Sequence, residues 1–461
     1  MTAPLAAPLT EMPGPPALPL IGSLPWMVGA DGVNQRLLSL AEVHRSAGLF
    51  RVVTPGGDAP IFVTSAALAE PLFDEKRFQK VIEGPLLSIR EFTGDGLFTA
   101  RRDEPAWGVG HRVLSPGFTP DAMERFLPSM RQVTAALLES WRRTAGPVDV
   151  VADMTKLTLD TISLCGFGFD FHSFTQPALH PFLQALGRAL QESMDRLFRP
   201  PGLGFLFAAK ARRFRDDVNE MSALVDGVIA QRRAQPPSAW PQDLLSLMLT
   251  EVDPKTGARL SDENIRFQVL TFLVAGHETT AGLLSFTLHQ LAVNPGLRAR
   301  VRAEVDEVIG SAEPSRAQVL RLSLVMRTLS ETLRLWPTVP VLTLAPVADE
   351  QVAGFRLPAG APINVLVSAL HRDPAVWSEP ERFDPDRFLP ETARARPTSA
   401  YKPFGNGSRA CTGRIFALTE AALAVALIVR EFDLTANGPL AIAPTTSPKP
   451  RGFTLEVRPR R

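Results

Sequence analysis

One short stretch decides how this sequence is interpreted: Lys402-Pro403-Phe404-Gly405-Asn406-Gly407-Ser408-Arg409-Ala410-Cys411-Thr412-Gly413. Its first two glycines, Gly405 and Gly407, permit a tight loop whose backbone N–H groups can turn inward. The amphipathic stretch 414–429 follows at once and predicts a helix, so Cys411 lies where a helix begins. Converging N–H donors and a helix N-terminus stabilise thiolate, the form of cysteine that binds metals. The stretch therefore predicts a metal-binding thiolate.

The remaining residues of this loop suit a flat, metal-containing group. Phe404 can shield the sulfur, Gly413 lets a flat group approach, and Arg409 can meet an acidic substituent. Taken alone, Cys411 would be interpreted as a buried free cysteine, but that interpretation leaves the loop unexplained. A bound haem explains each of these residues. The other cysteine, Cys165, has no such surroundings and is expected to be an ordinary core residue.

The run from Phe404 to Gly413 resembles the haem-binding signature of the cytochrome P450 family, Phe-Gly-x-Gly-x-Arg-x-Cys-x-Gly. With six specified residues, a chance match in one window is on the order of 10⁻⁸. Coincidence is therefore negligible. The resemblance covers nearly the whole chain, because three further marks of the family occur in the expected order: Ala275-Gly276-His277-Glu278-Thr279-Thr280, Glu331-x-x-Arg334 and Phe383-Asp384-Pro385-Asp386-Arg387-Phe388.

The resemblance implies haem b as the cofactor, with Cys411 as the axial ligand of its iron. Cysteinate pushes electron density onto the iron and favours O–O cleavage, so the resemblance implies oxygen activation rather than oxygen carriage. It also implies that Trp107, His111 and Arg409 contact the haem propionates, since Trp107-Gly108-Val109-Gly110-His111 is similar to the segment that does so in relatives. For the first two residues alone, core packing would be the simpler interpretation.

Three residues gain a structural role from the same resemblance. Glu331 and Arg334 stand at i, i+3, a spacing that by itself indicates a solvated surface pair. The resemblance implies instead that these two residues and Arg387 form the structural charge network of the family. We expect this network to support folding and haem retention on the side of the cysteine.

A second stretch predicts a long central helix. It opens at Ser261 as an N-cap and runs to Asn294-Pro295, about 48 Å at roughly 1.5 Å per residue. Polar residues interrupt its apolar middle, which costs free energy unless something compensates. The resemblance implies that Thr279 and Glu278 are an acid–alcohol pair delivering protons to dioxygen. The alternative for the threonine is a hydroxyl bonded to the carbonyl four residues earlier.

The same helix is expected to meet the haem at Ala275 and Gly276, with the glycine leaving space for dioxygen. By alignment with the family, an apolar pocket over the haem is expected to suit a hydrophobic substrate held mainly by burial. Each lining residue taken singly, other than Phe98, is more simply interpreted as ordinary core. The expected lining residues are Leu86, Ile89, Phe98, Ala275 and Val339.

The rest of the chain predicts a mainly α architecture with a minor β portion, in which haem lies between the central helix and the helix after the cysteine loop. Apolar residues recur at helical spacing in 133–141, 157–165, 182–197, 218–229 and 419–429. Small sheets are expected in 47–65 and 338–368, with strands such as Arg51-Val52-Val53 and Ile61-Phe62-Val63-Thr64. No repeat or long linker occurs. We therefore expect one domain over 1–461, opening with a Pro-rich segment of about 30 residues.

Composition restricts the classes of partner. The 49 basic and 48 acidic side chains nearly cancel, so no nucleic-acid binding by charge is expected. Two cysteines argue against a disulfide framework and suit a reducing cytoplasm. The N-terminus lacks the pattern of a signal peptide, and apolar segments such as 269–275 stop short of the roughly 20 residues that cross a bilayer. We expect a soluble, cytoplasmic protein without stable membrane insertion.

Within the family, the chain is similar to the haem domain of bacterial fatty-acid hydroxylases fused to a flavin reductase, through 92–99, 157–162 and the long helix. Because the chain ends soon after Cys411, we expect no fused reductase. Electrons from NAD(P)H would then arrive through separate ferredoxin or flavodoxin and reductase proteins. The positions that anchor a fatty-acid carboxylate in that group fall at Gly57 or Asp58 and at Phe62, which weakens a fatty-acid assignment.

Together these features predict a monooxygenase that inserts one atom of O2 into an apolar substrate, with fatty acids as one candidate class. A peroxide-driven oxygenase and a non-enzymatic haem-thiolate gas sensor are the alternatives, although a sensor would not need Glu278 and Thr279. A cysteine nucleophile is not excluded by spacing but leaves Arg409 unexplained. A dinucleotide site at 405–410 lacks a preceding strand, and a zinc hydrolase is excluded because Ala281 stands where its second histidine would be.

Overall fold

The computed structural model of the chain describes residues 7–29, 32–176, 180–199, 202–445 and 447–460. Helices dominate it, as the sequence predicts. The α-helices are α1 (Leu24–Met27), α2 (Gly32–Val43), α3 (Ala66–Ala69), α4 (Pro85–Thr93), α5 (Pro105–Leu114), α6 (Pro120–Arg143), α7 (Val150–Phe167), α8 (Pro181–Asp195), α9 (Ala208–Arg233), α10 (Leu244–Thr250), α11 (Asp262–Val293), α12 (Pro295–Val308), α13 (Arg316–Arg321), α14 (Ser323–Leu335), α15 (Val367–Leu370), α16 (Pro390–Arg394) and α17 (Arg414–Glu431).

In the described residues the β portion is small and divided among four sheets. The strands are β1 (Leu49–Arg51), β2 (Ile61–Val63), β3 (Phe78–Lys80), β4 (Val341–Pro346), β5 (Glu350–Val352), β6 (Phe355–Leu357), β7 (Ile363–Leu366), β8 (Phe432–Asn437), β9 (Ala441–Ile442), β10 (Pro450–Arg451) and β11 (Thr454–Pro459). One sheet has five strands in the order β1-β2-β7-β4-β3, in which β2 and β7 are parallel and the other adjacent pairs, β1/β2, β7/β4 and β4/β3, are antiparallel. The remaining sheets are the antiparallel pairs β5/β6, β8/β11 and β9/β10.

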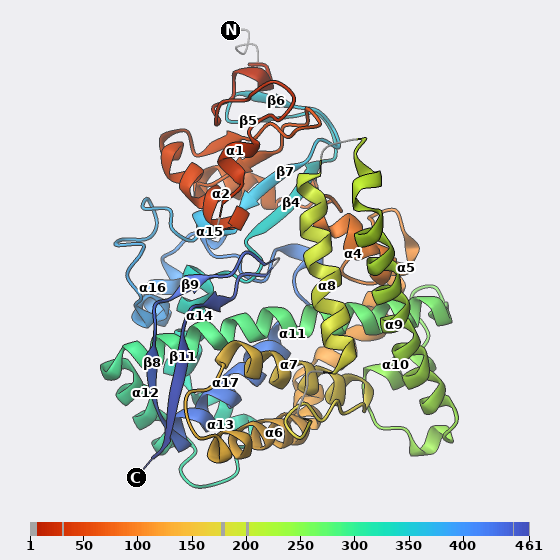
Figure 1. Cartoon of the computed structure of the whole chain (residues 1–461), viewed down its shortest axis with the longest axis vertical. Coiled ribbons are helices and arrows are strands. Elements are labelled where there is room, and N and C mark those ends of the chain that lie inside the picture. The colour runs from red at the N-terminus through yellow and green to blue at the C-terminus, as the bar shows by residue number, and fades with distance from the viewer. Residues whose placement is uncertain (1–6, 30–31, 177–179, 200–201, 446, 461) are drawn as a thin grey trace.

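The five-stranded sheet lies at one end of the molecule, whereas most of the long helices lie toward the other (Figure 1). The sheet lies with α1 and α2 toward the N-terminal end, and α11 crosses the middle of the molecule. In this view α6 and α17 lie below α11, and α8 and α9 lie side by side at the right. The extensive contact of α11 with α7 anchors the helical core. This arrangement confirms a mainly α fold with a minor β portion.

The predicted central helix is α11. Its N-cap is Ser261, whose side chain accepts a hydrogen bond from the Asn264 N–H, and the helix ends at Val293, just before Asn294 and Pro295. Contrary to the expectation from its short apolar runs, α11 is long and apolar enough to cross a bilayer, the one such helix in the described ranges. However, 78% of the relevant window is buried inside the protein. Burial of this extent is the pattern of a core helix.

The other predicted helices fall within α6, α7, α8, α9 and α17, and α8 ends at Asp195, before a short 3-10 turn takes up 196–198. Both predicted sheet regions are confirmed, but β1 is Leu49–Arg51 rather than 51–53. The β1/β2 ladder gives way after Arg51 to a turn closed by a hydrogen bond from Thr54 N to Asp58 O. The C-terminal ladders and β3 were not predicted, because strands this short carry little periodic pattern.

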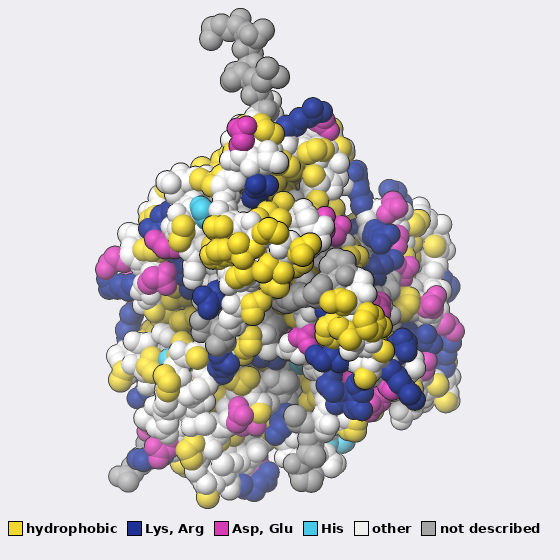
Figure 2. Space-filling model, turned by 45° about the horizontal axis from the view of Figure 1, so that its top comes forward, with side chains coloured by type: hydrophobic (Ala, Val, Ile, Leu, Met, Phe, Trp, Pro, Cys, Tyr) yellow, Lys and Arg dark blue, Asp and Glu magenta, His cyan; other side chains and the backbone are white. Residues whose placement is uncertain are grey.

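The molecular surface carries both signs of charge. Figure 2 shows Lys and Arg side chains interspersed with Asp and Glu. It also shows hydrophobic side chains gathered on the face near the N-terminal end, which is turned toward the viewer. Large exposed apolar side chains occur in the N-terminal segment, at Leu18, Leu20 and Ile21, and before α9, at Leu203, Phe205 and Leu206.

Candidate active site

The cysteine loop is held in shape by its glycines and by one acidic side chain. The Cys411 N–H donates to the Phe404 carbonyl at 2.8 Å, and φ is +77° at Gly405 and +62° at Gly407, values that favour glycine. A Cβ at Gly407 would collide with the Glu75 carboxylate, which accepts from both the N–H and the hydroxyl of Ser408. The predicted tight loop is therefore present, and Glu75 tethers it to the segment before β3.

Cys411 is exposed even though protein atoms surround its thiol. A Cβ built at Gly413 would lie 4.0 Å from the sulfur, so a side chain there would occupy the approach to it. Burial raises the pKa of the Cys411 thiol, and the Gly413 N–H, Arg414 and Lys80 act in the opposite direction without cancelling it. The loop therefore favours the thiolate through the Gly413 N–H, Arg414 and Lys80, but these groups do not fully offset burial. A bound metal cation would supply the missing stabilisation.

Three residues predicted to meet acidic groups converge next to this loop. The Arg409 guanidinium lies 4.0 Å from the centroid of the Trp107 ring, and that ring stacks on His111 with centroids 5.0 Å apart. The guanidinium also donates to the carbonyls of Ala100 and Arg101, each at 3.2 Å. Burial lowers the pKa of Arg409 to about 10. A cation, an indole N–H and an imidazole on one face suit an acidic substituent.

A fourth member of this cluster, Lys80, was missed in the sequence. It ends β3, its Nζ donates to the Phe98 carbonyl at 2.7 Å, and the ammonium lies 4.8 Å from the centroid of the Phe98 ring. Burial, followed by repulsion from Arg409, lowers the pKa of Lys80 to about 8. Two cations placed to repel one another favour an anion between them. No sequence signal marks this lysine, because it belongs to no motif and its strand was not predicted.

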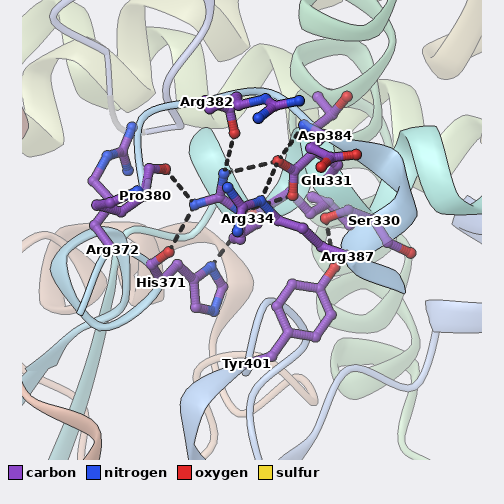
Figure 3. Close-up of polar contacts among 12 residues, drawn as sticks. Ser330, Glu331, Arg334, His371, Arg372, Pro380, Arg382, Asp384, Arg387 and Tyr401 are labelled. Carbon is purple, nitrogen blue, oxygen red and sulfur yellow. Dashed lines mark hydrogen bonds and ion pairs between the residues drawn. The ribbon is translucent and has the colours of Figure 1, made fainter. Parts of the chain in front are cut away.

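The predicted charge network surrounds Arg334, as Figure 3 shows. Arg334 and Glu331 are both fully buried, with two hydrogen bonds of 2.7 Å between them. Arg334 also donates to the carbonyls of His371, Pro380 and Arg382 at 3.1, 2.6 and 3.0 Å. Arg387 completes the network, with its Nε 3.5 Å from a Glu331 oxygen. The three residues of the predicted network therefore lie in contact, and Glu331 and Arg334 are not a solvated surface pair, because both are buried and connect α14 to residues 371–384.

The two central-helix residues predicted to handle protons are each bonded to something else. The Thr279 hydroxyl donates to the Ala275 carbonyl at 3.0 Å, which is the alternative interaction foreseen for it. A Glu278 oxygen accepts from Lys449 Nζ at 2.8 Å. Lys449 was missed, since it lies 171 residues away in a loop without a motif. Its attraction lowers the pKa of Glu278 although burial opposes it.

The comparison with known proteins decides the family. The cytochrome P450 family profile matches residues 12–459. This chain belongs to the cytochrome P450 family. It is 42% identical to bifunctional cytochrome P450/NADPH–P450 reductase 1 of Bacillus subtilis (strain 168) over 98% of the chain, and 38% identical to the bifunctional enzyme of Fusarium oxysporum over 97%. It spans 42% of the length of each of these relatives.

A solved structure shows the same fold. The haem domain of cytochrome P450DA matches this P450 with a TM-score of 0.92 and 43% identity, covering 99% of each chain. The residues of this P450 fit haem: an exposed cysteine thiol, and cations and N–H donors next to it for acidic substituents. Cys411, with Arg409, Trp107, His111 and Lys80, would hold the group.

One predicted role of the P450 helix α11 is wrong. Gly276 was expected to leave space for dioxygen, but a Cβ at that position would lie 2.8 Å from the Ile162 side chain of α7. The glycine therefore permits close packing of α11 on α7, which is the role that this contact gives it.

The predicted substrate-pocket residues come from separate elements of this P450. Leu86 and Ile89 lie on α4, and Phe98 follows that helix; Ile89 is 2% exposed within the main core, whereas Leu86 and Phe98 are partly buried against it. Val339, before β4, is 36% exposed.

The positions expected for a carboxylate anchor carry no cation. Gly57 and Asp58 lie exposed in the turn after β1, and Phe62 is buried in β2 and stacks on Phe50 with ring centroids 5.4 Å apart.

Two of the buried histidines, His277 and His371, are expected to make the folding stability of this P450 sensitive to acid. Burial lowers the pKa of His277 to about 4 and that of His371 to about 3, and His371 accepts from the Lys402 N–H at 2.9 Å. The unfolded chain, with an ordinary histidine pKa of about 6.5, binds more protons below that pH. Stability is therefore lost as pH falls. Between about pH 7 and pH 5, each histidine is expected to cost about 2 kcal/mol, measured by urea unfolding.

The matched variants for this prediction are His371→Gln and His172→Asn. The first should reduce the loss between the two pH values, and the second, at a largely exposed histidine, should leave it unchanged. Equal pH dependence in all three proteins would contradict the assignment.

Proposed function

We propose that this chain is the haem domain of a monooxygenase that inserts one atom of O2 into an apolar substrate and reduces the other to water. The observation that carries the proposal is Cys411, which is exposed in a glycine-shaped loop and flanked by a cationic cluster. When bound, haem supplies the activation of dioxygen, and a cysteinate ligand favours O–O cleavage.

Other residues of the chain are assigned to haem orientation, proton transfer and substrate binding. Arg409, Trp107, His111 and Lys80 orient the haem by meeting its propionates. Glu278 and Thr279 hold and move the protons that reduction of dioxygen consumes, and the apolar residues around Phe98 orient the substrate and exclude water. The buried network of Arg334 fixes residues 371–384 to α14, and His371 in turn accepts from the Lys402 N–H at the start of the cysteine loop.

Electrons are proposed to come from NADPH, since relatives that match nearly the whole chain are named as P450/NADPH–P450 reductase enzymes. Separate ferredoxin or flavodoxin and reductase proteins stay a prediction from the sequence, as do the single domain over 1–461 and a cytoplasmic location. The prediction of separate redox proteins is tested by adding such proteins to the purified chain and measuring NADPH consumption.

The substrate is proposed to be apolar, and fatty acids are one class to test. The absence of a cation at Gly57, Asp58 and Phe62 indicates that a carboxylate would not be fixed there. A comparison of fatty acids with the corresponding alcohols and alkanes in a spectral binding titration tests this. Equal affinity of acid and alcohol is expected.

The decisive test is an absorption spectrum of the reduced protein with carbon monoxide, recorded for wild type and Cys411→Ala. Wild type is expected to give the long-wavelength Soret band of a thiolate ligand, and the variant to lose it completely. Cys165→Ala is the matched control, because Cys165 is buried in the core with its sulfur 3.7 Å from the Phe126 carbonyl. A wild-type protein without this band would refute the proposed function.

A further inference from the structure

The loop of residues 94–98 lies directly on the N-terminal half of α11. At Gly94 φ is +47°, and a Cβ there would collide with the Phe267 ring. A Cβ at Gly96 would collide with the hydroxyl of Thr271. The two glycines therefore let the backbone of the 94–98 loop approach the helix more closely than larger residues would allow.

Gln268 of α11 binds this loop through its side-chain amide. Its Oε1 accepts from the Leu97 N–H at 3.0 Å, and its Nε2 donates to Asn264 Oδ1 at 3.0 Å. Asn264 in turn donates to a carboxylate oxygen of Asp95 at 2.7 Å. Because Asn264 and Gln268 are four positions apart, they share one face of the helix. That face is therefore bonded to the 94–98 loop at two positions, Asp95 and Leu97.

The Gln268 amide is buried where three elements meet. Gln268 is 0% exposed and Asn264 is 5% exposed. A Cβ at Gly110 on α5 would lie 2.8 Å from Gln268 Nε2, so this glycine leaves the room that the amide occupies. A buried amide without partners is costly, and so is a buried N–H. The bond between Gln268 and Leu97 therefore fixes the distance between the loop and α11.

The Leu97 N–H lies next to Phe98 in the chain, and the backbone after Phe98 is also held. The Phe98 carbonyl accepts from Lys80 Nζ at 2.7 Å, and the Thr99 hydroxyl lies 2.7 Å from that of Thr93. Lys80 belongs to the cationic cluster beside the cysteine loop, so Phe98 lies next to that cluster. With both flanking peptide groups bonded, the position of the Phe98 ring relative to α11 follows from the contact with Gln268.

We propose that Gln268 is a positioning residue that sets where the Phe98 ring stands relative to α11, and that it thereby determines which shape of apolar molecule the site accepts. This inference rests on the proposed function, in which the residues around Phe98 orient the substrate. A hydrogen bond prefers a narrow range of distance and angle, so it fixes the loop more closely than apolar packing does. A loop that is fixed in advance also loses less entropy when a ligand binds.

Hydrogen–deuterium exchange of the purified protein tests the bond directly and needs no turnover. Gln268→Met keeps the length of the side chain and removes both hydrogen bonds. The Leu97 amide is then expected to exchange roughly three- to tenfold faster than in wild type. Gln268→Glu keeps an acceptor oxygen whether or not it is ionised, and should restore the protection. Gln290→Met is the matched control, because Gln290 is buried on the same helix but bonds to Asn294 at 3.1 Å.

A second measurement connects the position of Phe98 to selectivity. The probes are imidazole and an imidazole with a phenyl group on a ring carbon. Both bind haem iron through nitrogen, but only the second places a ring in the apolar pocket. The preference for the phenyl compound, taken as the ratio of two spectral dissociation constants, is expected to fall roughly three- to tenfold in Gln268→Met. Gln268→Glu should recover it, Gln290→Met should keep it, and the reduced carbon monoxide spectrum should not change.

The variants separate positioning from a general loss of stability. Unchanged exchange and selectivity in Gln268→Met would overturn the assignment, and so would equal changes in Gln290→Met. If Gln268→Met does not fold, Asn264→Ala takes its place, since it removes the partner of the Gln268 Nε2 and the bond to Asp95. The same two changes, of smaller size, are then required. Failure of the proposed function shows itself separately, because wild type would lack the thiolate spectrum while the exchange of Leu97 could still be measured.

Discussion

Arg334→Ala is expected to yield little or no folded, haem-containing protein. Arg334 is fully buried and holds Glu331 through two hydrogen bonds of 2.7 Å. Its removal leaves an unpaired buried carboxylate and takes the donor away from three backbone carbonyls. Breaking a buried pair in this way costs about 3–5 kcal/mol, a large share of the roughly 5–15 kcal/mol that stabilises a folded protein. Soluble yield, haem content and the urea midpoint measure the effect.

An exposed pair supplies the control for this prediction. Arg356 and Asp349 are 69% and 52% exposed and 2.7 Å apart, so Arg356→Ala should change the unfolding free energy by less than about 1 kcal/mol. Arg334→Lys should not rescue the first variant, because one ammonium cannot reproduce the fork of a guanidinium that serves four acceptor groups. Similar midpoints for Arg334→Ala and Arg356→Ala would show that the buried network does not support the fold.

Thr279→Ala is expected to divert reducing equivalents to hydrogen peroxide while haem content stays close to that of wild type. The hydroxyl is the last group of the chain in the proposed proton path, and proton transfer by a positioned side chain contributes typically about 10²-fold or more to a rate. Without it, reduced dioxygen should leave as peroxide before its O–O bond is cleaved. The ratio of product and peroxide to NADPH consumed measures the diversion, and product per NADPH should fall by about tenfold or more.

The observed bond from Thr279 to Ala275 makes a matched control necessary. Ser285 lies on the same helix, is buried, and donates to the carbonyl four residues earlier at 2.7 Å, as Thr279 does at 3.0 Å. Ser285→Ala should therefore leave coupling unchanged, and Thr279→Ser should keep most of it. If Thr279→Ala and Ser285→Ala behave alike, the threonine hydroxyl only satisfies the helix backbone.

The residues around the cysteine could be predicted from the sequence because their geometry is local. The loop 402–413 requires glycines at positions of positive φ, and the helix that follows it has a regular apolar pattern. The long helix α11 was predicted for the same reason, since its N-cap and its ending proline stand in the sequence. The Glu331 and Arg334 pair is also local, but its burial is not, and the family resemblance rather than the spacing indicated it.

Tertiary structure alone decided which groups meet these local elements. It placed Lys449 on Glu278 from 171 residues away, Lys80 beside Arg409 from an unpredicted strand, and Ile162 against Gly276. Each of these contacts depends on how closely two separate elements approach, which side-chain volumes and burial across the whole core determine. The sequence by itself determined the cysteine loop, the central helix and the residue types of the site, because turn geometry and helical periodicity are short-range properties. The partners that fix the ionisation of Glu278 and Lys80 arise only when distant elements pack together.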